Sequence, residues 1–112
     1  MKVSHADKDG VGIFRLEGHL DSTTSGTLQA ALMPAAQVAV CRLAVDLSQV
    51  EYVSSAGLRI ILMAAKQARA SGGDLTLFGL TTWVRETFEI SGFTRIISIV
   101  DTEADAIRAV SP

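Results

Sequence analysis

The chain has 112 residues, of which 48% are hydrophobic, and its formal net charge is −2. This length fits one domain with a proper core, so we expect a single domain over residues 1–112. The ten Lys and Arg residues form no run, so the sequence gives no electrostatic basis for direct nucleic-acid or membrane binding. Cys41 is the lone cysteine, and no Cys/His cluster accompanies it, so we expect neither an internal disulfide nor a metal site.

The apolar segments are too short for membrane insertion or secretion. The first ten residues contain no hydrophobic stretch of the kind that a secretory signal needs. The most apolar segment, residues 60–65, is far below the roughly 20 residues that span a bilayer. Together with the single cysteine, these features predict a cytoplasmic protein.

The N-terminal half of the chain is predicted to form a hairpin, a helix and a buried strand. Strand segments are indicated by β-branched and alternating residues, and the helix by apolar residues three or four apart. A side-chain oxygen is preferred at a helix N-cap, which gives that role to Asp21 or Ser22. In chain order we expect a strand at 2–5, a turn at 7–10, a strand at 11–17, an interruption at 18–22, a helix at 24–36, a strand at 42–47 and its extension at 50–53.

The C-terminal half is predicted to alternate helices and strands. In chain order we expect a helix from residue 56 to the stop at Gly72-Gly73, a strand at 75–80, a helix from Thr81 or Thr82 to Ile90, a strand at 96–100, and a helix after Thr102 that turns Ala106, Ala109 and Val110 inward. Such alternation favours a parallel sheet. The predicted class is α/β, with a mixed, mostly parallel sheet, an N-terminal antiparallel hairpin and about four helices.

Catalytic motifs are absent from the sequence. A nucleophilic serine or cysteine needs a base, and the only histidines, His5 and His19, belong to the hairpin region. There is no GxSxG, no P-loop and no GxGxxG followed by a helix. Asp21 and Asp46 are expected near one another at the sheet edge, but two aspartates are weak evidence for catalysis. We therefore expect no enzymatic activity, no catalytic residue and no cofactor.

The sharpest local feature is the turn Ser54-Ser55-Ala56-Gly57 between a strand and a helix. Ser55 is expected to be the N-cap or the first helical residue, with its hydroxyl exposed among small neighbours. A helix N-terminus tolerates an added phosphate, because its free N–H groups and dipole favour negative charge. The alternative is that both serines only start the helix, since serine is a preferred N-cap.

Four segments resemble one known family, in order and over nearly the whole chain. They are LEGHLD at 16–21, DLSQVEYVSSAGLR at 46–59, GDLTL at 73–77 and VRETFEISGF at 84–93. This combination is similar to STAS domains, and more narrowly to the bacterial anti-sigma factor antagonists. Three positions depart from the pattern of the turn: Ser54 stands for a frequent Asp, Ala56 for a Ser or Thr, and Arg59 for a Gly.

The resemblance implies a partner switch. The unphosphorylated protein would bind an anti-sigma factor that is also a GHKL-type serine kinase, and a PP2C-type phosphatase would reverse the phosphorylation. It implies Ser55 as the phosphoacceptor, with Ser54 as the competing alternative. The expected partner-binding residues are Asp21, Ser54, Ala56, Gly57, Leu58 and Arg59. The other hypothesis is a STAS interaction module in another regulatory or lipid-transport assembly, without phosphorylation.

Expectations for the remaining notable side chains are simpler. Asp21 has two roles open, in function and as a helix cap, and Asp46 is expected to end a strand and order the loop before Ser55. Trp83 is left open between an exposed contact and a partly buried plug. Cys41 is expected to be a small core residue. His5 and His19 are expected to be solvated loop residues.

Overall fold

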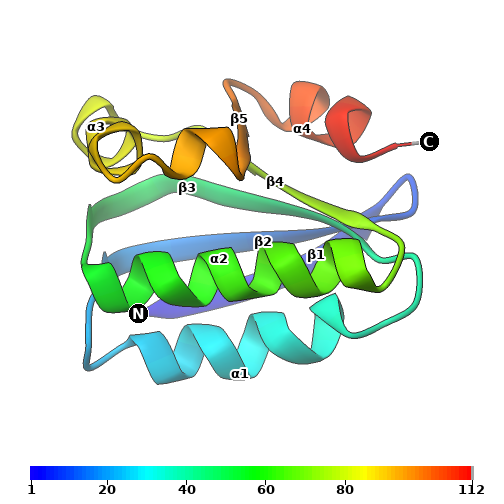
Figure 1. Cartoon of the computed structure of the whole chain (residues 1–112), viewed down its shortest axis with the longest axis horizontal. Coiled ribbons are helices and arrows are strands. Elements are labelled where there is room, and N and C mark those ends of the chain that lie inside the picture. The colour runs from blue at the N-terminus through cyan, green and yellow to red at the C-terminus, as the bar shows by residue number, and fades with distance from the viewer. Residues whose placement is uncertain (112) are drawn as a thin grey trace.

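A five-stranded sheet carries helices on both faces in the computed structural model, which describes residues 1–111 (Figure 1). The strands are β1 (Lys2–Lys8), β2 (Val11–Leu20), β3 (Arg42–Val53), β4 (Asp74–Phe78) and β5 (Ser98–Val100). The helices are α1 (Ser25–Ala36), α2 (Ser55–Ala70), α3 (Thr82–Ile90), the short 3₁₀ helix η1 (Phe93–Arg95) and α4 (Glu103–Val110).

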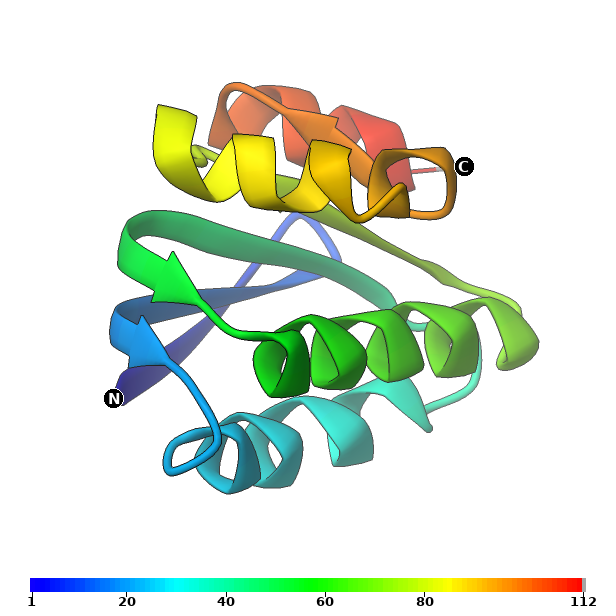
Figure 2. The ribbon, with the colours of Figure 1, turned by 60° about the vertical axis from the view of Figure 1, so that its left-hand side comes forward.

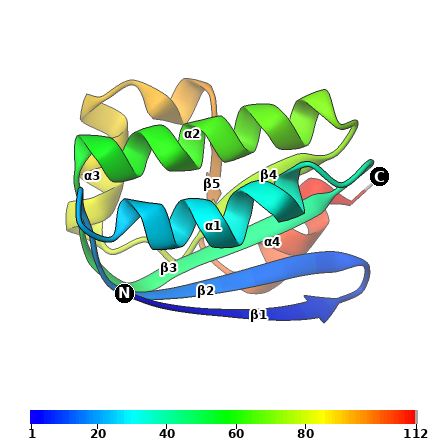
Figure 3. The same ribbon diagram turned by 90° about the horizontal axis from the view of Figure 1, so that it is seen from below.

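The strands lie side by side in the order of the sequence, β1-β2-β3-β4-β5. β1 is antiparallel to β2, and every other neighbouring pair is parallel. This confirms the predicted mixed sheet with its N-terminal hairpin. Seen from below, α1 and α2 run together along one face of the sheet, and α4 lies on the other face (Figure 3).

The helices bury two separate clusters of side chains. The larger cluster joins the sheet to α1, α2 and α3, and it includes Leu28, Ile61 and Phe88. The smaller cluster lies under α4, where Ala106 and Val110 contact the opposite face of the sheet. Ala109, which the sequence pattern placed inward beside them, is exposed.

The first two strands extend further than predicted. β1 continues to Lys8, so the turn shrinks to Asp9-Gly10, and β2 continues through residues 18–20. Gly18 adopts a φ of 111° where the pairing of β2 with β3 shifts register. The glycine that suggested a break therefore accommodates an irregularity within a continuous strand, because glycine lacks the Cβ that disfavours positive φ.

The candidate site lies at the end of the molecule where β3 extends beyond the shorter strand β4. β4 pairs only with residues 42–46 of β3, and α3 packs beside β3 beyond that point (Figure 2). The far end of β3 lies between β2 and α3 and leads directly into α2. The chain beginnings of α1, α2 and α3 therefore gather at one end of the sheet.

Candidate functional site

Ser54 is the N-cap of α2. Its backbone is extended, with φ −84° and ψ 172°, and its Oγ accepts a hydrogen bond from the Gly57 amide at 3.3 Å. Its own amide donates to the Leu20 carbonyl oxygen at 2.8 Å, and its carbonyl accepts from the Leu58 amide at 2.9 Å. Ser54 is half-buried, and its side-chain oxygen, amide and carbonyl all form hydrogen bonds at the start of the helix.

Ser55 is the first residue of α2 and is exposed. No hydrogen-bond partner for its Oγ is found among residues 1–111. One serine of the pair therefore caps the helix, and the hydroxyl of the other is free in solvent at the helix N-terminus. Sequence reasoning left Ser55 as either the cap or the first helical residue, and the structure makes it the latter.

Gly57 and Leu58 face the core. A Cβ built on Gly57 would lie 2.4 Å from Leu20 Cγ, so this position brings α2 close to the end of β2. Leu58 is 5% exposed and packs in the larger core cluster. Neither residue offers a side chain to a partner. The exposed members of the predicted surface are Ser55 and Arg59, with Ala56 and Asp21 partly exposed.

Asp21 stabilises the turn before α1 and is not the cap of that helix. Its Oδ1 accepts hydrogen bonds from the Thr23 amide at 2.9 Å, the Thr23 hydroxyl at 2.6 Å and the Thr24 amide at 3.2 Å. The Thr23 hydroxyl bond, followed by the backbone bonds, lowers the pKa of Asp21. Thr24 occupies the N-cap position, so the prediction of Asp21 or Ser22 was wrong. A tight turn intervenes, and Asp side chains favour such turns.

Asp21 and Ser55 lie at the same edge of the sheet. The hydrogen bond from the Ser54 amide to the Leu20 carbonyl joins the residues that precede them, and Leu20 pairs with Val53 in the sheet. An anionic carboxylate thus accompanies the free hydroxyl at the carboxyl ends of β2 and β3.

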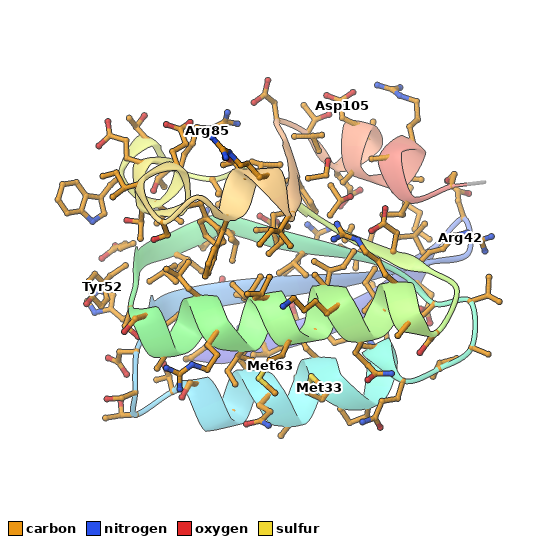
Figure 4. All side chains as sticks on the ribbon, in the orientation of Figure 1. Met33, Arg42, Tyr52, Met63, Arg85 and Asp105 are labelled. Atoms are coloured by element: carbon orange, nitrogen blue, oxygen red, sulfur yellow. The ribbon has the colours of Figure 1, made fainter. Side chains whose placement is uncertain are left out.

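Aromatic side chains are exposed at this end of the molecule. Tyr52 is 45% exposed, points away from the body of the fold (Figure 4) and packs edge-on to His19 at 6.2 Å between ring centroids. Trp83, in the first turn of α3, is 65% exposed, so it is not a partly buried plug. The exposure of Trp83 could have been predicted from the sequence, because Trp83 lies outside the helical stripe formed by the buried residues Val84 and Phe88.

Three expectations about individual side chains need correction. Asp46 lies within β3, far from Asp21, and its carboxylate pairs with Arg15 at 3.0 Å on the face that carries α4. It therefore does not end the strand. His5 and His19 are exposed, as expected, but they belong to β1 and β2 and not to loops. Cys41 is buried, as predicted.

Residues 1–111 contain no group of three His, Cys, Asp or Glu side chains that could hold a metal ion. The described part of the chain also has no pocket of ligand size. No helix within it is both long enough and apolar enough to cross a bilayer. The candidate site is thus an open surface around Ser55.

The comparisons with known proteins agree with this fold. Residues 3–101 match the family model described as "Mlab, STAS domain". The chain belongs to the STAS domain family.

Two curated relatives match almost end to end. The "Putative anti-sigma factor antagonist BtrV" of Bordetella bronchiseptica is 38% identical over 109 residues, covering 97% of this chain and 94% of the relative. The "Anti-sigma-B factor antagonist" of Listeria monocytogenes is 31% identical over 105 residues, covering 94% and 91%.

Solved structures show the same fold. An anti-sigma factor antagonist from Mycobacterium paratuberculosis superposes with a TM-score of 0.85 at 24% identity, over 97% of this chain and 92% of the other. The Bacillus cell fate determinant SpoIIAA in its phosphorylated form gives a TM-score of 0.69 at 18% identity, over 96% and 98%.

Proposed function

We propose that this protein is an anti-sigma factor antagonist and not an enzyme. It binds an anti-sigma factor with GHKL-type serine kinase activity in a partner-switching pathway, and phosphorylation of Ser55 ends the binding. A PP2C-type phosphatase restores the active form. The names of the full-length relatives support the first part of this proposal. The pathway belongs to the cytoplasm.

The observation that carries the proposal is the difference in hydrogen bonding and exposure between the hydroxyls of Ser54 and Ser55. Ser54 Oγ already accepts the Gly57 amide and is half-buried, whereas Ser55 is exposed and its hydroxyl is free within the described residues. A kinase needs access to the hydroxyl that it modifies, and this favours Ser55 over Ser54 as the phosphoacceptor. The proposed docking surface is Ser55 with Asp21, Ser54, Ala56 and Arg59, and Gly57 and Leu58 hold it in place from the core side.

Phosphorylation acts on this surface through charge. The phosphate adds about −1.5 to −2 charges and three acceptor oxygens. It stands at the same sheet edge as the Asp21 carboxylate, whose lowered pKa keeps it ionised at neutral pH. A partner that covers a neutral hydroxyl would have to desolvate a dianion there, at a cost of about 3–4 kcal/mol, which weakens binding roughly 10²–10³-fold.

Charge variants of Ser55 test this proposal. The measurement is the affinity for the anti-sigma factor that is recovered with this protein from its native cells, for the wild type, Ser55→Ala and Ser55→Asp. Ser55→Ala is expected to retain the wild-type affinity, whereas Ser55→Asp is expected to lose most of it. Ser4→Asp is the matched control, because it adds the same charge at an exposed position of β1 away from α2. Equal affinity of Ser55→Ala and Ser55→Asp would contradict the switch.

A second candidate is an interaction module in another regulatory or lipid-transport assembly, in which Ser55 only begins the helix. The match to a family model described as "Mlab, STAS domain" supports a STAS interaction module in general and is therefore consistent with this candidate. Mass spectrometry of the protein isolated from its native cells separates the two. Signal-dependent phosphate on Ser55 supports the switch, and a chain that stays unmodified under all conditions supports the module.

A further inference from the structure

The charges of this protein are unevenly distributed over its surface. The ten Lys and Arg residues include three on α2, namely Arg59, Lys66 and Arg69, whereas none of the twelve acidic residues lies on α1 or α2. These two helices therefore carry a net charge of +3, and the remainder of the chain carries −5. An acidic protein thus presents one positive helical layer, on the face of the sheet seen in Figure 3.

α1 lacks charged side chains although much of it faces solvent. Residues 22–41 contain no Asp, Glu, Lys, Arg or His, in a chain where 20% of residues are charged. The buried side of α1 consists of Leu28, Leu32 and Ala36. Its exposed positions are equally free of charge: Gly26, Thr27, Gln29, Ala30 and Pro34. A solvent-facing helix usually carries charges on its outer side, so this surface is unusually poor in charge.

α2 contributes a stripe that is both apolar and cationic. Arg59, Met63 and Lys66 are exposed and follow each other at intervals of four and three residues, which places them on one side of the helix. Met63 is 40% exposed. Neither Arg59 nor Lys66 makes an ion pair with any of residues 1–111, whereas Arg69 is paired with Asp74 at 3.2 Å. Two cations of this stripe are therefore available to a partner.

The uncharged side of α1 and the stripe of Arg59, Met63 and Lys66 on α2 form one surface. Met33 on α1 and Met63 on α2 come from adjacent helices that pack against one another (Figure 4). We call the surface formed by Ala30, Met33, Pro34, Arg59, Met63 and Lys66 the α1/α2 face. Methionine is flexible and polarisable, and it is common on surfaces that receive amphipathic helices.

We propose that the α1/α2 face binds an acidic amphipathic helix of a partner protein. The apolar side of that helix would lie on Met33, Met63 and Ala30, and its carboxylates would meet Arg59 and Lys66. At 1.5 Å per residue, α1 and α2 are about 18 and 24 Å long, which accommodates a single helix laid along them.

The charge pattern favours this occupant over a lipid surface, and a second copy is tested separately. Membrane attachment through electrostatics uses clusters of roughly four to eight cations, together with large apolar side chains, and the α1/α2 face has two free cations and methionines. In a second copy, an acidic helical face with exposed apolar residues exists on α3, with Trp83, Glu86, Glu89 and Ile90. A contact of α3 with α2 of another copy would be heterologous and would form a ring or an open chain, so it would show as a mass that rises with protein concentration.

The test uses the unphosphorylated protein with 13C-labelled methionine methyl groups. The probe is a synthetic 18-residue amphipathic helix with leucine on one side and glutamate on the other, and the control peptide carries lysine in place of glutamate. The glutamate peptide is expected to shift the methyl signals of Met33 and Met63 saturably, with an affinity that falls as salt is added. The lysine peptide is expected to leave them in place.

Matched variants locate the contact. Lys66→Glu is expected to weaken binding of the glutamate peptide about tenfold, because it places like charges in contact. Arg95→Glu is the control, since Arg95 is exposed in η1 and forms no ion pair within residues 1–111. Equal loss in both variants would overturn the proposal, and so would the absence of methyl shifts, binding to anionic vesicles in place of the peptide, or a mass that rises with protein concentration. Arg59 belongs to both surfaces, but Lys66, Met33 and Met63 lie outside the docking surface around Ser55, so these readouts report the α1/α2 face and not the switch.

Discussion

Gly57 has no room for a side chain, and this explains how α2 is held at the end of the sheet. A Cβ at this position would lie 2.4 Å from Leu20 Cγ and 3.1 Å from the Leu20 carbonyl oxygen, which also accepts the Ser54 amide. The position of the Ser55 hydroxyl therefore depends on the close packing of Gly57, two residues further along α2, against Leu20 of β2.

Gly57→Ala is expected to destabilise the protein by about 1–3 kcal/mol, the usual cost of overpacking a core. Gly26→Ala is the matched control, because a Cβ there meets nothing within 4 Å. As a glycine-to-alanine change inside an exposed helix, it is expected to stabilise by about 0.5–1 kcal/mol. Urea unfolding of both variants provides the measurement. A neutral Gly57→Ala would show that α2 can move away from Leu20 freely.

The division of roles between Ser54 and Ser55 could be predicted only in part. The sequence Ser54-Ser55-Ala56-Gly57 predicts a helix start with a serine cap, but both serines fit that role. The choice depends on the extended backbone at Ser54, which is set by the hydrogen bond of its amide to Leu20, 34 positions earlier in the chain. The local sequence around Ser54 cannot predict this hydrogen bond, because its partner Leu20 is distant in the chain.

At the scale of elements, an ion-pair network joins the hairpin to the last helix. Arg15 of β2 pairs with Asp46 of β3 and with Glu103 of α4, and Lys8 of β1 also reaches Glu103 at 3.5 Å. The hydrogen bond from Arg15 lowers the pKa of Glu103 from its ordinary value near 4.5 and raises the pKa of Arg15. The network fixes α4 on the face of the sheet opposite α1 and α2.

The lowered pKa of Glu103 predicts a pH dependence of stability. A carboxylate whose folded pKa is depressed contributes stability above its unfolded pKa, and that contribution is lost as the pH falls through the folded value. The wild type is therefore expected to lose stability as the pH falls below about 4.5. Glu103→Gln is expected to be less stable at neutral pH by about 1 kcal/mol or less, and to lose less on acidification.

Urea unfolding at several pH values measures this dependence. Glu86→Gln serves as the control, because Glu86 is exposed on α3 and forms no ion pair within the described residues. If Glu103→Gln and Glu86→Gln have the same pH profile, the network does not contribute to stability.

The elements themselves were largely predictable from local patterns. The helices α2, α3 and α4 begin at the predicted Ser54-Ser55 turn, Thr81 and Thr102, since their caps and periodicity are local signals. The extension of β2 through Gly18 and the place of Asp46 within β3 were not predictable, because both depend on neighbouring strands. The pairing of Arg15 with Glu103 spans 88 positions of the chain.

At the scale of the whole molecule, the proposed switch and the ion-pair network lie in different parts of the structure. The chain beginnings of α1, α2 and α3 gather at one end of the sheet (Figure 1). Ser55 and Asp21 follow the carboxyl ends of β3 and β2, whereas Arg15 pairs with Glu103 of α4 on the opposite face of the sheet from α1 and α2. Ser55 is exposed and belongs to neither core cluster, so a charge added there stays in solvent and the proposed switch requires no refolding.

Phosphorylation at Ser55 is therefore expected to leave the fold unchanged. In a comparison of amide spectra with and without phosphoserine at position 55, the shifts should be confined to the first turn of α2 and the turn at Asp21. The unmodified protein is the reference for both peak positions and hydrodynamic radius. Widespread shifts in β4 or α4 would indicate a conformational change and contradict a purely local effect.

The most direct measurement is the affinity of the anti-sigma factor for the protein prepared with phosphoserine at position 55, at position 54, or at neither, by isothermal titration calorimetry. Ser55 offers its hydroxyl to solvent, so phosphate there is expected to weaken binding roughly 10²–10³-fold without loss of folding. Undiminished affinity of the folded, Ser55-phosphorylated protein would contradict the account.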